Sequence, residues 1–276
     1  MLTSLLVSAT LGLVAPDDPG AARAEVRRIL ENAAAAQNAD AVAADLRDFS
    51  VRLYLTRRDD EGSRVELDVH RKFKAPDMLW TRIEEKAISG STFQQGFDGK
   101  TSWMHDEDRD ETLLYEGPEY RTDRKQIETD LKTMRQLLRF LFLRNLIPAL
   151  SDLERLEDAS DGDLHTMVVR GRGRLPETDD KECVVTLWIE KGTDLLIGAR
   201  LEVEGNVPMQ FCFWNHAPNP QGIVVPGSTK VYRNDEELPS EVLSIVGLQD
   251  DDGDPRNDIL FNTGIDDGTF RPPSDG

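Results

Sequence analysis

The sequence feature that most constrains the fold is an alternation of apolar and polar residues in Ser63–Phe73. Successive side chains of a β-strand point to opposite faces, so this alternation predicts an antiparallel strand with one apolar face and one face in water. Phe49–Arg57 alternates in the same way, and the two segments predict a hairpin that turns around Arg58–Gly62. The apolar face is expected to carry Leu53, Val65, Leu67, Val69 and Phe73, and the face in water Glu66, Asp68 and His70.

Shorter strand-like runs follow along the chain and bring the expected total to about eleven strands. They are Met78–Glu84, Thr92–Phe97, Thr101–His105, Glu111–Tyr115, Leu164–Arg170, Cys183–Glu190, Ile197–Glu204, Met209–Asn215, Ile223–Tyr232 and Val242–Gly247. Proline, glycine and acidic residues fill the turns between them. The tail from Leu248 is expected to be mostly loop, anchored by Ile259–Phe261 and Phe270.

Two segments have helical periodicity instead. Pro19–Leu46 is rich in alanine, with apolar residues at spacings of three and four, and predicts one N-terminal helix that ends near Asp48. Tyr120–Leu146 carries a longer apolar stripe, and Pro148 is expected to stop this helix. The stripe is Ile127, Leu131, Met134, Leu138, Leu141 and Phe142, and the charged residues expected to point outward are Asp130, Lys132 and Arg135.

These elements predict an α+β architecture in which a large antiparallel sheet is covered by the N-terminal helix and the inserted amphipathic helix. A sheet of this size with one apolar face must curl or be covered, and incomplete filling would leave an apolar chamber. The sequence has no internal repeat and no Pro/Ser-rich linker. Residues 23–276 are therefore expected to form a single domain.

Charge excludes some partners. Fifty-two Asp and Glu against 33 Lys and Arg give a formal net charge of −19. Such a chain lacks the basic field that nucleic acids and anionic membrane surfaces attract, so neither is an expected partner.

The N-terminus suggests export. Met1–Ala15 has no charged residue and an apolar stretch too short for a membrane span, which is typical of a secretory signal; a frayed apolar N-terminus is the alternative. Cleavage after Ala15 or after Ala22 both fit, so residues 1–22 are treated as signal peptide and leader. No cysteine near these sites could carry a lipid anchor. We therefore expect a soluble periplasmic protein.

The sequence contains no strong motif for catalysis or for binding a metal ion or a phosphate. The four histidines have no metal-ligand spacing, Gly99-Lys100-Thr101 lacks the first glycine of a phosphate loop and reads as a turn, and the acidic run Asp250–Asp254 fails the calcium-loop pattern. No nucleophile motif occurs, so we expect no enzyme activity, no metal and no cofactor. Cys183 and Cys212 are expected to be reduced core residues, with a disulfide as the alternative.

The sequence feature that does point to a ligand is a set of large apolar residues. Trp80, Trp103, Trp188 and Trp214 all lie on predicted strands, and Phe140–Leu143 crowd the inserted helix. Most such residues fill a core, but some could line a pocket for an acyl or other apolar ligand. The residues alone leave both interpretations open.

Four stretches in order resemble the periplasmic outer-membrane lipoprotein carriers, the LolA-like family. They read RKFKAPDMLW at Arg71–Trp80, FDGKTSWMHD at Phe97–Asp106, VTLWIE at Val185–Glu190 and IDDGTFRPP at Ile265–Pro273. The resemblance implies a curved, incompletely closed antiparallel β-barrel with a helical lid and a cavity that shields lipid chains. The ligand-binding residues that follow are Leu53, Val65, Leu67, Val69, Phe73, Trp80, Trp103, Leu131, Met134, Leu138 and Phe142.

One position departs from the family pattern. Its carriers have an arginine immediately before the proline, which helps to set the closed lid; here that residue is Ala75, and Lys74 lies on the opposite face by parity. The resemblance further implies lipoprotein or lipid cargo, membrane-bound donor and acceptor proteins, and a monomer. The alternatives to a carrier are a non-enzymatic sensor or interaction module on the same fold and, more distantly, a secreted enzyme.

Overall fold

The computed structural model describes residues 19–58, 63–85, 90–175, 178, 181–234, 236–249 and 255–273. Contacts within the chain divide it into two compact units. The first unit takes its described residues from 1–44, 138–216 and 223–242, and the second from 45–137, 217–222 and 243–276. That residues 23–276 form the single predicted domain stays a prediction. No helix in the described part of the chain is long and apolar enough to cross a membrane.

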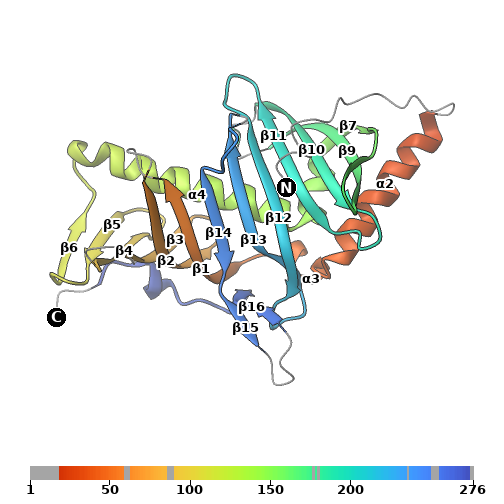
Figure 1. The fold of residues 1–276 in the computed structure, drawn as a ribbon. Helices are drawn as coiled ribbons and strands as arrows, with labels where there is room; N and C mark the ends of the chain where they lie inside the picture. Colours follow the sequence, from red (N-terminus) through yellow and green to blue (C-terminus); the bar gives the residue numbers. More distant parts are fainter. Residues whose placement is uncertain are drawn as a thin grey trace. The chain divides into compact units, whose positions relative to one another are not determined.

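The second unit is built on an antiparallel meander in the order β6-β5-β4-β3-β2-β1 (Figure 1). Its strands are β1 Asp48–Arg58, β2 Arg64–Lys74, β3 Met78–Glu85, β4 Thr92–Phe97, β5 Ser102–Asp106 and β6 Glu111–Leu114. β17 (Ile259–Phe261) pairs with the beginning of β1, and β15 (Gly247–Gln249) pairs with β16 (Pro255–Asn257). The hairpin predicted from the alternation is confirmed, with Leu53 opposite Val69 and Leu55 opposite Leu67.

The two faces of this meander differ as the alternation predicts. We call the inner face the one that carries Phe49, Val51, Leu53, Leu55, Leu67, Val69, Phe73 and Leu79, all of which are buried. The outer face carries the residues between them. Glu66 is exposed there, whereas Asp68 and His70 are only half-exposed, so the predicted parity holds but part of the outer face is a packed polar layer.

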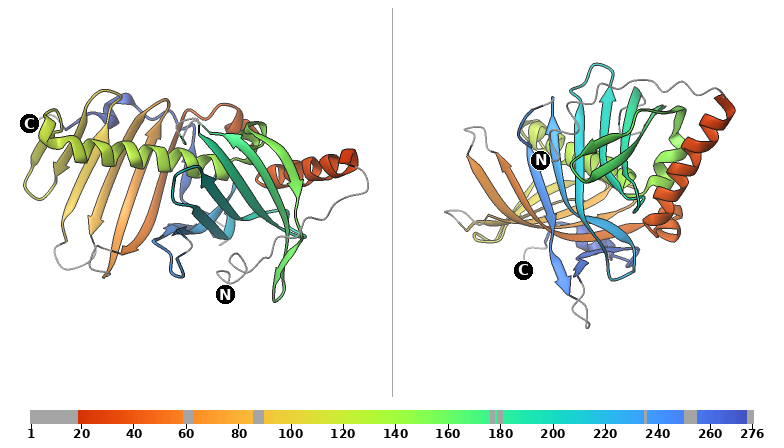
Figure 2. Two further views of the ribbon diagram at one scale, coloured as in Figure 1. Left: turned by 90° about the horizontal axis from the view of Figure 1, so that it is seen from above. Right: turned by 45° about the vertical axis from the view of Figure 1, so that its right-hand side comes forward.

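Different segments cover the two faces. α4 (Arg121–Leu141) crosses the strands on one side (Figure 2) and buries Ile127, Leu131 and Met134, so its apolar stripe lies on the inner face. On the outer face, Trp103 Nε1 donates a 2.8 Å hydrogen bond to the carbonyl of Phe270, at the end of the short helix η4 (Asp267–Phe270). Ile259, Phe261 and Phe270 are buried, which confirms that these residues anchor the tail.

The first unit has its own antiparallel order, β13-β12-β11-β10-β9-β7, with β8 paired to β9. Its strands are β7 Leu150–Arg155, β8 Ala159–Asp161, β9 Leu164–Arg174, β10 Glu182–Glu190, β11 Leu196–Val203, β12 Met209–Pro218 and β13 Val224–Arg233. β14 (Glu241–Ile245) spans the boundary between the units in sequence. The described part of the chain is thus α+β and consists mostly of antiparallel sheet. The sheet order does not close on itself, and it contains more strands than the eleven expected.

The predicted helices are each broken once. Pro19–Leu46 forms α2 (Pro19–Ala36) and α3 (Asp40–Ala44), and the second predicted helix divides into α4 and α5 (Leu143–Leu146), followed by the 3₁₀ turn η2 (Ile147–Ala149) that contains Pro148. Asn38 separates α2 from α3 with φ of +52°, a left-handed conformation that asparagine tolerates.

Gln37 explains both breaks. Its backbone carbonyl accepts a 2.9 Å hydrogen bond from Val224 N, which draws the chain out of the helix. Its side-chain oxygen accepts from Leu143 N at 3.1 Å, an amide at the beginning of α5 that has no partner within that helix. The periodicity of apolar residues carries no signal for either contact.

The first unit also contains the remaining tryptophans and both cysteines. Trp188 lies in an apolar cluster against which Trp214 packs; its buried members are Leu156, Val168, Trp188, Ile197, Cys212 and Tyr232.

Cys183 and Cys212 are buried and free, which confirms the reduced state. Through β11, Cys212 aligns with Trp188 rather than with Cys183, so the two thiols are offset along the strands. Burial is the largest cause that raises the pKa of Cys212, to about 11.

Candidate functional site

The inner face of the second unit and the helix α4 form the candidate site. Leu53, Leu67, Val69 and Phe73 lie on the strands and are each less than a tenth exposed, while Val65 is half-buried nearer the end of β2. From the helix, Leu131 and Met134 are buried in the same way. The structure therefore brings together seven of the eleven residues that the sequence nominated.

Trp80 and Trp103 lie on the other face. In the strand register Trp80 is opposite Lys72 and Gly96, and Trp103 is opposite Gly96, which places both rings on the outer face. Trp80 donates to Gln94 at 2.9 Å and lies under the Lys72 ammonium at 4.8 Å. The expectation that these rings share a surface with Val69 is wrong, because the register reverses their direction.

Trp103 instead has a structural position. A Cβ added to Gly96 would lie 2.5 Å from the Trp103 ring, so the ring rests directly on the glycine backbone. With its bond to the Phe270 carbonyl, the ring fixes the C-terminal segment on the outer face.

Leu138 and Phe142 belong to the first unit, where both are buried. Nearby, Phe140 packs on Phe211 with ring centroids 5.3 Å apart.

Arginine side chains attach α4 within the second unit. At its beginning, Arg124 Nη1 donates to the carbonyls of Tyr115 and Glu116 at 3.0 and 3.1 Å. About three turns later, Arg135 donates to the carbonyl of Pro76 at 2.6 Å and pairs with Asp77, in the turn between β2 and β3. The prediction that Arg135 points away from the sheet is wrong, because its long side chain reaches this turn; Lys132 is exposed as expected. The side chain of Asp130 lies outside the described residues.

The turn between β2 and β3 is therefore held from both faces. On the outer face, Lys74 Nζ donates to the carbonyl of Ile265 at 2.7 Å and pairs with Asp267, which agrees with the parity expected for Lys74. Ala75 is exposed and contributes no side-chain bond to α4.

The outer face also holds a partly buried imidazole. His70 Nε2 is 2.9 Å from Ser50 Oγ, and the ring meets Trp80 edge-on at 5.2 Å. Burial, followed by the positive charges of Lys72 and Arg52, lowers the pKa of His70 to about 4. This histidine is neutral near pH 7 and belongs to the packing of the outer face.

Sequence reasoning missed two polar residues of the inner face. Arg71 lies between Val69 and Phe73 on β2, and Thr81 is directly opposite it on β3. Thr81 is fully buried, and neither its Oγ1 nor Arg71 Nε has a hydrogen-bond partner in the structure. The alternation that defined the apolar face already places Arg71 on it, since residues 65, 67, 69, 71 and 73 share one parity.

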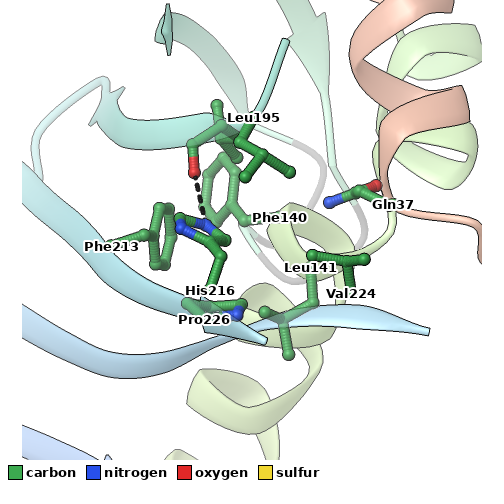
Figure 3. Close-up of a pocket in the computed structure, with 9 residues that line it drawn as sticks. Gln37, Phe140, Leu141, Leu195, Phe213, His216, Val224 and Pro226 are labelled. Carbon is green, nitrogen blue, oxygen red and sulfur yellow. Dashed lines mark hydrogen bonds between the residues drawn. The ribbon is translucent and has the colours of Figure 1, made fainter. Parts of the chain in front are cut away.

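The first unit contains a small pocket near the end of α4 (Figure 3). It is lined by Gln37, Phe140, Leu141, Leu195, Leu196, Phe213, His216, Val224 and Pro226. The space that water-sized molecules can reach is about 10 Å³, roughly what one water molecule needs. His216 Nε2 is 3.1 Å from the Leu196 carbonyl, and burial lowers the pKa of this imidazole. The pocket is too small for an acyl chain.

The alternative chemical motifs have simpler explanations. Asp98 Oδ1 accepts from the amides of Lys100 and Thr101, and Gly99 has φ of +93°, which confirms a turn in place of a phosphate loop. Within the described ranges, no group of three or more His, Cys, Asp or Glu side chains is placed to hold a metal ion. The acidic run Asp250–Asp254 and the predicted signal segment lie outside the described residues, except for the start of α2 at Pro19.

Comparisons with known proteins give similarities of structure alone. No protein-family model matches the sequence, and no curated protein is detectably similar to it. A putative outer membrane lipoprotein-sorting protein domain from Vibrio parahaemolyticus and a LolA superfamily protein from Nitrosomonas europaea each have a TM-score of 0.45 and 11% identity, over 89% of this chain and 97% of theirs. A DUF1329 family protein from Desulfovibrio piger has the same TM-score and coverage at 10% identity. The structure is thus similar to LolA superfamily and lipoprotein-sorting domains.

Proposed function

We propose that the protein is a non-enzymatic carrier of the cell envelope that shields the acyl chains of lipoproteins or other lipids during transfer towards the outer membrane. The observation that carries this proposal is the inner face of the second unit, an apolar surface that one amphipathic helix covers. The incompletely closed barrel expected from the sequence would supply the surrounding wall. Its surfaces are the inner face and the apolar stripe of α4.

The free energies of apolar burial favour replacement of α4 by a lipid chain on the inner face. Burying Ile127, Leu131 and Met134 stabilises the closed helix by about 1.5–3 kcal/mol for each side chain, or roughly 5–9 kcal/mol in all. A sixteen-carbon chain leaving water gains about 0.8 kcal/mol per CH₂, or about 13 kcal/mol. An acyl chain can therefore displace the helix from part of the inner face and still leave a favourable balance.

The bonds that attach α4 are weak enough to let this helix act as a lid. The bonds of Arg124 and Arg135 hold it near two points of the second unit, both through side chains that are at least partly exposed. Breaking such bonds costs little, because water replaces them. We place the carrier in the periplasm as a monomer, with membrane-bound donor and acceptor proteins as partners and no nucleic acid.

Native mass spectrometry of the protein purified from its own envelope tests the proposal. Lipid or lipoprotein that co-purifies supports it, and uptake of a fluorescent fatty acid by the delipidated protein gives a second measurement. Failure to retain any lipid and to take up any apolar probe would overturn the carrier. The inner face would then be a packed core, and the sensor or interaction module would become the better proposal.

A matched pair of variants tests the site. Leu131→Glu places a carboxylate on the buried stripe of α4, where an unpaired charge costs several kcal/mol, so the helix should leave the inner face. We expect the far-ultraviolet spectrum of the strands to be kept. The amount of probe bound at equilibrium should fall at least tenfold, because the displaced apolar stripe no longer covers the bound chain. Lys125→Glu, on an exposed position of the same helix, should change neither. Equal loss of uptake in both variants would exclude the stripe as the binding surface.

A further inference from the structure

A row of polar side chains interrupts the inner face. Arg71 on β2 is opposite Thr81 on β3, and Thr81 is opposite Gln95 on β4. The apolar residues Val51 and Met104 flank this polar row on either side. Residues opposite each other on antiparallel strands have Cα atoms roughly 4.5–5.5 Å apart, so the Arg71 and Thr81 side chains leave the sheet next to each other.

Two atoms of this row lack the hydrogen bonds that buried polar groups require. Thr81 is fully buried, and its Oγ1 has no partner. Arg71 Nε is likewise buried without a partner. A donor left unpaired in a protein interior destabilises the fold, and native structures keep few of them. Side chains of this kind are retained where another group completes their bonding.

The charged surroundings of Arg71 also differ from those of the other basic residues on these strands. Among the described residues no acidic side chain pairs with it, although the chain carries 19 more negative than positive charges. On the outer face of the same strands, Arg82 bonds Glu107 at 2.8 Å and Lys74 pairs with Asp267. The inner-face neighbours of Arg71 along β2 are Val69 and Phe73, both buried and apolar. The residue as a whole is partly exposed, so its side chain is not closed off from solvent.

We propose that Arg71 and Thr81 bind the anionic oxygen head of an acyl amphiphile whose chain lies on the inner face beneath α4. This inference rests on the proposed carrier function and specifies the ligand class. A guanidinium binds a carboxylate or phosphate oxygen pair through parallel N–H donors, and the Thr81 hydroxyl supplies a further donor. Both donors lie within the apolar face, so head and chain are recognised on one surface.

Matched ligands and variants test the proposal. The probes are hexadecanoate and hexadecanol, below their aggregation limits at pH 8 and fixed salt, with displacement of a fluorescent apolar dye as the measurement. We expect the wild type to bind hexadecanoate at least tenfold more tightly than hexadecanol. Arg71→Met should abolish this preference, Arg71→Lys should keep part of it, and Thr81→Val should reduce it several-fold.

The controls separate charge from position. Arg52→Met removes an equal charge from an exposed position on the outer face and should keep the preference. Acetate should not compete, since it lacks the chain; competition by acetate would make the site an anion site without a lipid. Arg71→Met should unfold at the same or a higher temperature than the wild type, because it removes an unpaired buried donor. If this variant does not fold, Arg71→Lys and Thr81→Val still report the preference.

The outcomes distinguish the two proposals. Equal affinity of the wild type for acid and alcohol, unchanged by Arg71→Met, would overturn the headgroup site and leave the carrier intact. Binding of neither ligand by any variant would overturn the carrier, and the headgroup site with it.

Discussion

Loosening one end of α4 gives the sharpest measure of whether this helix acts as a lid. Arg135→Ala removes the bond to the Pro76 carbonyl and the ion pair with Asp77. The two side chains of the pair are 36% and 50% exposed, so the ion pair is worth about 0.2–1 kcal/mol. The bond from a charged donor to the carbonyl adds about 1 kcal/mol after the same discount for solvent.

The loss of about 1–2 kcal/mol should fall on the helix alone. A difference of this size shifts an equilibrium about 5- to 30-fold. We therefore expect the backbone amides of α4 to exchange with deuterium about 5 to 30 times faster, with no change in the amides of β2 and β3. Lipid uptake should accelerate by a similar factor, because the ligand binds only when the helix is open.

Two further variants separate the ion pair from the carbonyl bond and provide a control. Asp77→Asn removes the ion pair and keeps the carbonyl bond, so its effect should be the smaller part of the total. Glu128→Ala, on an exposed position of α4, should leave exchange and uptake unchanged. Unchanged exchange in Arg135→Ala, or equal acceleration in the helix and the strands, would refute a locally opening lid.

Three other changes test the supporting structure. Trp103→Phe leaves the Phe270 carbonyl unpaired, which should cost about 1–3 kcal/mol of unfolding free energy and speed proteolysis of the C-terminal segment; unchanged cleavage would contradict the anchor. Gln37→Ala leaves the Leu143 amide without its partner and should lower the melting temperature by several degrees, whereas Gln37→Glu, which retains an acceptor, should lower it less. His70 has its pKa lowered from 6.5 to about 4, so the unfolded chain binds the extra proton first and stability falls as the pH drops from 6.5 towards 4, by at most about 1.4 kcal/mol per pH unit; His70→Gln should flatten this part of the profile.

The alternation in β1 and β2 was sufficient to predict their pairing and their buried face. Apolar residues of period two specify a strand locally, and burial of one face then fixes which side is inside. The stripe of α4 was predictable for the same reason at helical period. The short strands β7, β8 and β15–β17 were not, because these segments contain too few alternating apolar residues to distinguish a strand from a loop.

Trp80 shows why the candidate site was only partly predictable. β3 has large apolar residues on both faces, with Leu79 and Ile83 on one and Trp80 on the other. Its direction relative to β2 depends on the geometry of the turn at Ala75–Asp77, which the apolar pattern does not encode. Arg71 was missed for the opposite reason: its parity was available, but only apolar residues were sought on the apolar face.

The two arginines of the second unit divide lipid binding into separable steps. Arg135 lies on the helix and bonds the turn outside the inner face, so its loss should change how often the face opens and affect hexadecanoate and hexadecanol equally. Arg71 lies on the face itself, so its loss should change which ligand is kept after opening, without changing amide exchange in α4. The two effects should then be additive in free energy when Arg135→Ala and Arg71→Met are combined. A combined variant whose effect on ligand preference differs from that of Arg71→Met alone would show that opening and head recognition are one event.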